Sequence, residues 1–277
     1  MNSWEITYPD GMVKFVDFFR AKNFQYEVYD KVVKDYLEEH SKISVDKICS
    51  LGSGTGRHEV QLAKMGYSII GVERNQESLP ILNALFAKEG ISSIEVIEAD
   101  FLNEEALKAK LTGYQFDCIL LLFIPLSIED VKKVVCLFEP YIKVGGVILT
   151  NQFFGYDDGF VPNCTLSECD FADNPFQERS TTSEFCVRLN TFKYGDMIID
   201  WTAVYIYYDN NHCLQMSRDR DIIEVLGHDT YVETLRMANG SSMELLPVRE
   251  VTECSLEMNM PKTSDYIVAW RKTDAQI

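Results

Sequence analysis

The sequence predicts an α/β fold, a parallel β-sheet covered by helices on both faces, with a small antiparallel β insertion. Three observations support this prediction. Short apolar runs alternate with amphipathic stretches between residues 47 and 153, a glycine-rich turn follows the first apolar run, and the pattern changes to period-two alternation after Phe154. With 277 residues, of which 46% are hydrophobic, the chain can fill the core of one large domain with an insertion.

The first 40 residues are expected to form a helical cap. Apolar residues fall at helical spacings from Val13 to Tyr36, after the turn signal Pro9-Asp10. The expected boundaries are 1–40 for the cap, 41–153 and 229–277 for the core domain, and 154–228 for the insertion.

Between residues 47 and 153, strand-like and helix-like segments alternate. The expected strands are Lys47–Leu51, Tyr67–Val72, Ile94–Glu98, Cys118–Phe123 and Val147–Phe153, and the expected helices are Arg57–Met65, Pro80–Lys88, Glu104–Leu111 and Ile128–Ile142. Gly66, Gly90 and Gly113 follow the first three helices, where a left-handed residue commonly ends a helix.

After Phe154 the pattern changes. The stretch NCTLSECDFADNPFQERSTT is irregular and polar, whereas SEFCVRLNTFKY and MIIDWTAVYIYYDNNHCLQMSR alternate at period two and predict an antiparallel sheet with a hairpin turn at Asp209-Asn210-Asn211. A helix over Thr230–Ala238 and strands over Met243–Val251 and Asp265–Arg271 are expected to follow.

Composition favours a small-molecule partner. The formal charge is −17, from 43 acidic and 26 basic residues, and without a basic stripe a nucleic acid would be repelled. No apolar run approaches the roughly 18 to 20 residues that span a bilayer, and the N-terminus does not resemble a signal peptide, so we expect a cytoplasmic protein without a membrane partner. A homodimer is compatible with the sequence.

The eight cysteines form neither a CxxC pair nor a cluster with histidine at zinc spacing. Several lie within apolar runs, where cysteine acts as a small hydrophobic residue. We therefore expect no metal site.

The segment GSGTGRH, residues 52–58, lies between a predicted strand and a predicted helix. Glycines at such a turn let a ligand lie against the backbone and offer N–H groups at the positive end of the helix. A dinucleotide fingerprint needs its third glycine at position 57, where this chain has Arg57, and the lysine of a Walker motif is missing.

Acidic residues end the next two strands. Glu73 lies 21 residues after Gly52, where a carboxylate accepts the hydroxyls of a ribose. Asp100 ends the third strand and is suited to accept the exocyclic amine of an adenine, with Phe101 packing on the ring. The carboxyl edge of the sheet is therefore predicted to bind a nucleoside.

These motifs, together with FDCILLLF, VGGVIL and DYIVAWRK, resemble those of class I S-adenosylmethionine-dependent methyltransferases. The resemblance implies a Rossmann-like, seven-stranded, mostly parallel sheet with an antiparallel last strand, and S-adenosyl-L-methionine as cofactor. GSGTGRH and YDKVVKDY narrow it to members that methylate small metabolites, including amino-sugar and glycine-type N-methyltransferases.

The resemblance also implies roles for individual residues. Gly52, Gly54 and Gly56 would pass beside the amino-acid part of the cofactor, Glu73 would hold the ribose, Asp100 and Phe101 the adenine, and Leu122 and Phe123 would lie beside the methionine portion, with Tyr29 as a cap. The chain departs from the family pattern at Ser50, where an acidic residue is usual, and at Val144, where proline is common.

Methyl transfer mainly requires alignment of nucleophile and methyl carbon, so an amine acceptor, which we favour slightly over a hydroxyl, needs no demanding base. If a base acts, Tyr29 and His212 are candidates, with Asp157 and His228 also open. The four histidines do not cluster, so each is expected at the surface or at a helix cap. Two alternatives are a nicotinamide-dependent oxidoreductase and a catalytically silent regulatory protein that binds S-adenosylmethionine.

The insertion is expected to cover the substrate. The segment from Gly155 to about Arg218 leaves the carboxyl edge of the sheet, the edge that carries the predicted cofactor residues. In the alternative interpretation, its sheet only buries one face on the core or on a second subunit.

Overall fold

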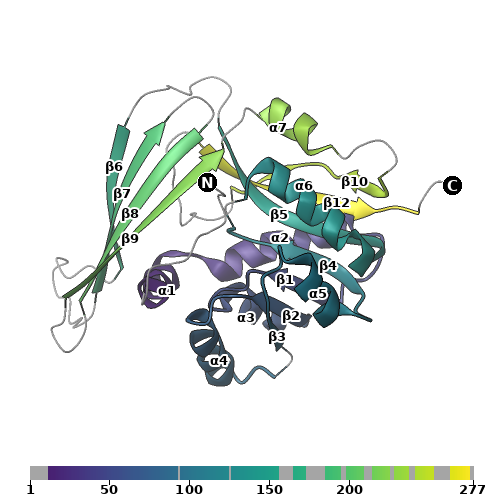
Figure 1. The fold of residues 1–277 in the computed structure, drawn as a ribbon, viewed down its shortest axis with the longest axis horizontal. Helices are drawn as coiled ribbons and strands as arrows, with labels where there is room; N and C mark the ends of the chain where they lie inside the picture. The colour runs from purple at the N-terminus through teal and green to yellow at the C-terminus, as the bar shows by residue number, and fades with distance from the viewer. Residues whose placement is uncertain are drawn as a thin grey trace.

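An eight-stranded sheet, with seven of its strands in one row, forms the centre of the molecule (Figure 1). The computed structural model describes residues 12–92, 94–124, 126–155, 165–172, 185–194, 198–208, 214–224, 228–236, 241–252 and 263–274. The strands, in spatial order, are β10 (Met243–Leu245), β12 (Thr263–Lys272), β5 (Ile142–Gly155), β4 (Phe116–Leu121), β1 (Lys47–Leu51), β2 (Ser68–Glu73) and β3 (Ile94–Glu98).

The direction of the strands confirms the predicted fold class. Strands β1 to β5 pair in parallel, whereas β12 runs antiparallel to β5 from the pair Thr263 and Gly155 to the pair Arg271 and Val147. The predicted strand Met243–Val251 is divided into β10 and β11 (Arg249–Glu250), which both pair with β12. Pro247 lies between them and has no N–H group to donate to a continuous ladder.

Helices cover both faces of this sheet (Figure 1). They are α2 (Tyr26–His40), α3 (Arg57–Lys64) and α4 (Ser78–Glu89) on one face, and α5 (Glu104–Leu111), α6 (Ile128–Phe138) and α7 (His228–Leu235) on the other. Neighbouring strand residues point to opposite faces, so Ile48 packs beneath α2 while Cys49 packs with the α5 and α6 side. The two buried faces explain why the strands read as apolar runs.

The N-terminal region forms two helices, not one continuous helix. Helix α1 (Met12–Asn23) ends where the Asn23 side chain donates to the Phe19 carbonyl, and α2 begins at Tyr26. Helix α2 buries its apolar face on the large sheet, whereas α1 packs on the insertion. The helical periodicity continues through the break, which is why the sequence did not reveal it.

The insertion is a four-stranded antiparallel sheet in the order β6 (Thr165–Ala172), β7 (Phe185–Tyr194), β8 (Ile198–Tyr208) and β9 (Leu214–Glu224). It lies beside the large sheet and next to α1 (Figure 1). Phe15 of α1 stacks on Tyr207, and Phe19 meets Tyr205 edge to face. One face of the small sheet is therefore buried by the N-terminal helix.

One part of the insertion was predicted wrongly. Strand β6 lies in the stretch interpreted as irregular and polar, and it pairs with β7 along its whole length, from Thr165 opposite Lys193 to Ala172 opposite Cys186. Its polar residues hide the alternation, so the strand is specified by its neighbour more than by its own composition. The predicted turn Asp209-Asn210-Asn211 lies outside the described residues, although β8 and β9 pair as a hairpin requires.

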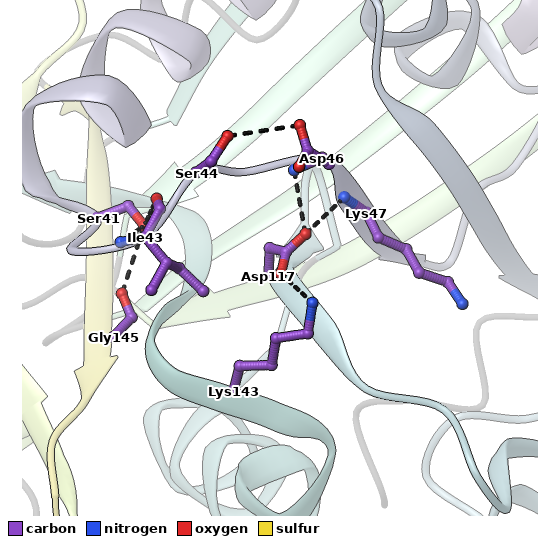
Figure 2. Close-up of polar contacts among 8 residues, drawn as sticks. All are labelled: Ser41, Ile43, Ser44, Asp46, Lys47, Asp117, Lys143 and Gly145. Carbon is purple, nitrogen blue, oxygen red and sulfur yellow. Dashed lines mark hydrogen bonds and ion pairs between the residues drawn. The ribbon is translucent and has the colours of Figure 1, made fainter.

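A buried carboxylate joins three elements at the amino edge of the large sheet (Figure 2). Asp117 of β4 accepts hydrogen bonds from the backbone N–H groups of Asp46 and Lys47, at 3.0 and 2.8 Å, through Oδ2. Its Oδ1 accepts from Lys143 Nζ of β5 at 2.6 Å. Burial opposes ionisation, but Lys143 and the two N–H groups outweigh it, so the pKa of Asp117 is lowered.

No helix in the described part of the chain is long and apolar enough to cross a membrane. Cys49, Cys118 and Cys186 are buried, as expected of cysteines that act as small hydrophobic residues, and burial raises the pKa of each thiol. Within the described ranges no group of three histidine, cysteine or acidic side chains is arranged to hold a metal ion.

Candidate cofactor pocket

The glycine loop joins β1 to α3 and has two kinds of glycine. Gly54 has a φ of +55°, and a Cβ atom there would meet only the Gly52 carbonyl oxygen, at 4.0 Å, so this residue faces open space. Gly56 has a φ of +80°, and a Cβ atom there would lie 2.7 Å from the Phe86 ring and 3.0 Å from Leu82. Gly54 therefore leaves room beside the backbone, whereas Gly56 allows α3 to pack closely on α4.

Glu73 ends β2 directly beneath this loop. Its Oε2 atom accepts a hydrogen bond from Gly54 N at 2.6 Å, and its Oε1 atom accepts from Asn75 N at 2.6 Å. The side chain is largely buried, with the residue 7% exposed. The carboxylate thus fixes the loop and keeps lone pairs for a further donor.

Asp100 and Phe101 follow β3 at the same edge. Asp100 accepts from Leu102 N at 3.0 Å and pairs with Arg74 at 3.0 Å, in a partly exposed position. The Phe101 ring is buried and lies 3.7 Å from the place of a Cβ atom on Gly52. These two residues give the pocket a polar edge and an aromatic wall.

A single pocket brings most of the predicted residues together. Gly52, Gly54, Glu73, Asp100, Phe101, Leu122 and Phe123 all line it, whereas Gly56 lies behind the loop and does not. Additional wall comes from residues that the sequence analysis did not single out as ligands, among them Arg20, Tyr26, Arg57, His58 and Asn75. None of the residues of β7 and β8 lines this pocket, so the predicted substrate-covering role of the insertion stays a prediction.

Tyr29 is placed in the core instead of at the pocket surface. It is fully buried, its ring lies 5.0 Å from that of Phe123, and its hydroxyl interacts with the carboxylate of Asp265 and lowers the pKa of that group. Its suggested role as a cap or base is therefore not supported by its position. His212 and Asp157 lie outside the described residues, and His228 is the first residue of α7.

Phe123 has an unusual backbone conformation, with a φ of +56°. Its N–H group donates to Asn151 Oδ1 at 2.6 Å, and Asn151 Nδ2 in turn donates to Asp265 at 3.2 Å. This conformation costs about 1 to 2 kcal/mol for a residue other than glycine. The buried amide therefore holds the Phe123 ring in place, stacked on His58 at 5.3 Å.

His58 was expected at the surface or at a helix cap, and that prediction was wrong. Its Nδ1 atom lies 2.6 Å from Oδ1 of Asp30, a fully buried residue of α2. Burial opposes the charged ring, but the charge and hydrogen bond of Asp30 outweigh burial, so the pKa of His58 is raised. A sequence signal was available, because Asp30 interrupts the apolar face of α2 and such a residue needs a buried partner.

A buried carboxylate contacts Ser50, the position at which the chain departs from the family pattern. The Ser50 hydroxyl donates to Oε1 of Glu59 at 2.5 Å, and Glu59 is only 2% exposed. A carboxylate from α3 thus lies next to position 50, although neither Ser50 nor Glu59 lines the pocket. Burial raises the pKa of Glu59, and within the described ranges its Oε2 atom has no hydrogen-bond partner.

Helix α1 is fastened to the glycine-loop helix by a bidentate ion pair. Arg57 donates to the two carboxylate oxygens of Asp17 at 2.7 and 2.8 Å. Both side chains are mostly shielded from solvent, at 23% and 13% exposed, so the pair is stronger than a typical surface pair. This contact brings Arg20 and the start of α2 to the pocket.

Comparisons with known proteins agree with this geometry. The chain matches the family described as Tellurite resistance protein TehB over residues 12–180. It is 28% identical to human EEF1A lysine methyltransferase 2 over 157 residues, 53% of this chain and 64% of that protein. It is 26% identical over 152 residues, 54% of this chain and 50% of the relative, to the probable S-adenosyl-L-methionine-dependent methyltransferase TehB of Haemophilus influenzae strain 10810. The chain thus spans less than two thirds of the length of either relative.

Solved structures share the fold over nearly the whole chain. A S-adenosylmethionine-dependent methyltransferase from Clostridium acetobutylicum ATCC 824 superposes with a TM-score of 0.66 at 14% identity, covering 94% of this chain and 98% of that chain. The sugar N-methyltransferase KedS8 from Streptoalloteichus sp ATCC 53650 gives 0.64 at 14% identity, over 94% and 93%. At these identities the similarity establishes the fold alone. Because the family match extends over more than half of the chain, the protein belongs to the TehB family of class I S-adenosylmethionine-dependent methyltransferases, as the motif resemblance predicted.

Proposed function

We propose that this protein transfers the methyl group of S-adenosylmethionine to a small-molecule acceptor, with an amine nitrogen as the preferred nucleophile. The observation that carries the proposal is the single pocket formed by the open face of Gly54, the Glu73 carboxylate, Asp100 with Phe101, and Leu122 with Phe123. The family match leaves no support for the nicotinamide-dependent alternative.

The pocket suits each part of this cofactor. Glu73 offers an acceptor to ribose hydroxyls, Asp100 offers one to the adenine amine, and Phe101 offers an apolar surface to the ring. Arg20, at the glycine-loop side, supplies a positive group for the amino-acid part. When bound, the cofactor supplies an electrophilic methyl group on a sulfonium ion.

Two lines of support favour a small acceptor. The charge of −17 disfavours polyanionic partners, and KedS8, described as a sugar N-methyltransferase, shares the fold over most of both chains. The resemblance to human EEF1A lysine methyltransferase 2 favours a second candidate, methylation of a protein lysine. Both candidates use an amine as nucleophile, so only the size of the acceptor separates them.

The first test is calorimetric titration with S-adenosylmethionine. The wild-type protein should bind, and Glu73→Ala should bind more weakly by about 1 to 3 kcal/mol, which is about 5- to 150-fold in Kd, because hydrogen bonds to a buried polar edge are lost. Glu98→Ala, at the end of the adjacent strand β3 and outside the pocket, is the matched control. Equal affinities of wild type and Glu73→Ala would remove the nucleoside assignment.

In the second test, the protein is incubated with methyl-labelled cofactor and a cell extract. The labelled products are then separated by mass. Label in a low-mass amine supports the proposal, whereas label in a protein lysine favours the second candidate. Binding of the cofactor without label in either fraction would favour a silent regulatory protein.

A further inference from the structure

His58 occupies an unusual place for a titratable side chain. It lies two residues after Gly56 and lines the pocket, yet its side chain is only 14% exposed. His40, by contrast, lies at the end of α2 and does not line the pocket. A shielded imidazole in the wall of a ligand pocket is well placed to exchange a proton with a ligand.

The hydrogen bond to Asp30 distinguishes the two ring nitrogens. An ionised carboxylate only accepts, so Nδ1, at 2.6 Å from Asp30, carries the hydrogen. In the neutral ring Nε2 is then an acceptor. Within the described ranges Nε2 has no partner, which leaves it for a ligand. A base oriented by a buried carboxylate through its other nitrogen is a recurring catalytic arrangement.

Packing fixes the plane of the ring. Phe123 stacks on His58 with an angle of 9° between the planes, and Tyr26 meets it edge to face at 4.8 Å. Asn151 holds the backbone of Phe123, so this stacking surface is itself fixed. The ring therefore needs little reorganisation before it accepts a proton.

The charged groups that influence His58 come from four elements: Arg20 of α1, Asp30 of α2, Glu59 of α3 and Asp265 of β12. Burial and Arg20 disfavour the imidazolium, whereas Asp30 and Glu59 favour it, and the net effect raises the pKa of His58. Burial also raises the pKa of Asp30. The His58–Asp30 pair therefore retains one proton to higher pH than an exposed histidine does.

We propose that His58 is the catalytic residue that takes the proton of the acceptor amine, and that Asp30 is its positioning residue; this inference rests on the proposed function. An aliphatic amine is mostly protonated at neutral pH and has no lone pair for attack. The Nε2 lone pair of His58 takes one proton, the N–H bond breaks, and its electron pair stays on the amine nitrogen. That pair forms the new bond to the methyl carbon while the carbon–sulfur bond breaks and its electrons go to sulfur. The product ammonium carries the positive charge, and the proton on His58 passes to solvent.

The first test needs no acceptor. NMR titration of the imidazole signals follows the four histidines of the chain, and His58→Asn assigns the His58 signal. The expected result is a His58 pKa above the ordinary value of about 6.5, which falls in Asp30→Asn because the charge that raises it is removed. A His58 pKa that does not respond to Asp30→Asn would overturn the positioning role.

The second test separates proton transfer from cofactor binding. His58→Asn keeps a side-chain amide near Nδ1, able to pair with Asp30, and removes the nitrogen left for the ligand. The substrate is the low-mass amine that becomes labelled in the extract assay. With it, the kcat of His58→Asn should be about 100-fold below that of wild type and should no longer depend on the ionisation of His58. The calorimetric affinity of His58→Asn for S-adenosylmethionine should stay within about 3-fold of wild type. In Asp30→Asn the rising limb of kcat should move to lower pH. His40→Asn, on α2 outside the pocket, should match wild type.

The outcomes are distinguishable. An unchanged kcat and pH profile in His58→Asn would overturn the inference while leaving the methyltransferase proposal intact. Lost cofactor affinity with unchanged kcat would also overturn it, because His58 would then hold the cofactor. Absence of methyl transfer by the wild-type protein to any low-mass amine contradicts the proposed function itself, and the NMR titration then decides the His58–Asp30 arrangement independently.

Discussion

Buried carboxylates at the two edges of the large sheet differ in their hydrogen-bond partners and in the direction of their pKa shifts. At the amino edge, Asp117 has three donors, two backbone N–H groups at the start of β1 and Lys143 of β5, and its pKa is lowered (Figure 2). At the carboxyl edge, Asp30, Glu59 and Asp265 have fewer or weaker partners, and burial raises the pKa of each. The comparison indicates that the amino edge is arranged for stability, whereas the carboxyl edge keeps incompletely paired charges beside a pocket.

The largest effect on stability is expected at the amino edge. Asp117→Ala should lower the free energy of unfolding by about 3 kcal/mol, because two backbone N–H groups and Lys143 lose their acceptor. Since the folded-state pKa of Asp117 lies below the unfolded value of 3.8, its contribution is present above that pH and is lost as pH falls through the folded pKa. Urea denaturation of wild type and Asp117→Ala at several pH values measures the loss of stability and its pH dependence.

The matched control is Lys108→Ala, which removes an exposed ion pair with Glu104 and should change stability by less than about 0.5 kcal/mol. Equal effects of the two substitutions would abolish the contrast between the edges.

Two glycines of one loop should separate stability from binding. Gly56→Ala should lower the free energy of unfolding by about 2 kcal/mol, since its Cβ would meet the Phe86 ring and the backbone is left-handed. Gly54→Ala should cost about 1 kcal/mol of stability but weaken cofactor binding more, because its Cβ enters the open face. Denaturation and calorimetry on both variants test this, and normal binding by Gly54→Ala would mean that the loop is only a turn.

The substitution Asp265→Asn tests the carboxyl edge. Burial is the main reason that the pKa of Asp265 is raised to about 7, against the lowering effects of Asn151 and Tyr29. The folded state therefore holds this proton more tightly than the unfolded state, and ionisation destabilises the fold as pH rises toward 7. The amide removes that penalty, so the gain in stability should be larger at pH 8 than at pH 5, by about 2 to 3 kcal/mol. A gain independent of pH would show that Asp265 does not ionise in this range.

The smallest effect is expected at Asp100. It is partly exposed and paired with Arg74, so Asp100→Ala should weaken cofactor binding by about 1 kcal/mol, less than Glu73→Ala. Calorimetry on the two variants in parallel checks the order. A reversed order would mean that the buried carboxylate serves the loop more than the ligand.

The fold was largely predictable because its strands are buried on both faces and its helices end at glycines. The strands Lys47–Leu51 and Ile94–Glu98 and the helix Glu104–Leu111 have the predicted bounds. Strand β6 and the break between α1 and α2 were missed, because both depend on which surface a segment meets and not on its own periodicity.

The predicted cofactor-binding residues share one property: each lies at or just after the end of a parallel strand, and such ends meet at one edge. Glu73 and Asp100 therefore meet at the pocket as expected. Arg20 and Tyr26 were missed because α1 and α2 reach the pocket only through tertiary contacts such as the Asp17–Arg57 pair. His58, on α3, was missed because its buried partner Asp30 lies on α2. The roles of these residues toward the cofactor stay predictions.

The position of α1 also has a consequence for the order of folding. Its aromatic partners, Tyr205 and Tyr207, belong to β8, so most of the chain must be synthesised before α1 can dock. Contacts between segments so distant in sequence form slowly, because loop closure must come first. The glycine loop and its strands can form early, but the wall that carries Arg20 closes late. We therefore expect a ribosome-bound chain that ends before β8 to have the sheet edge of the pocket without its α1 wall.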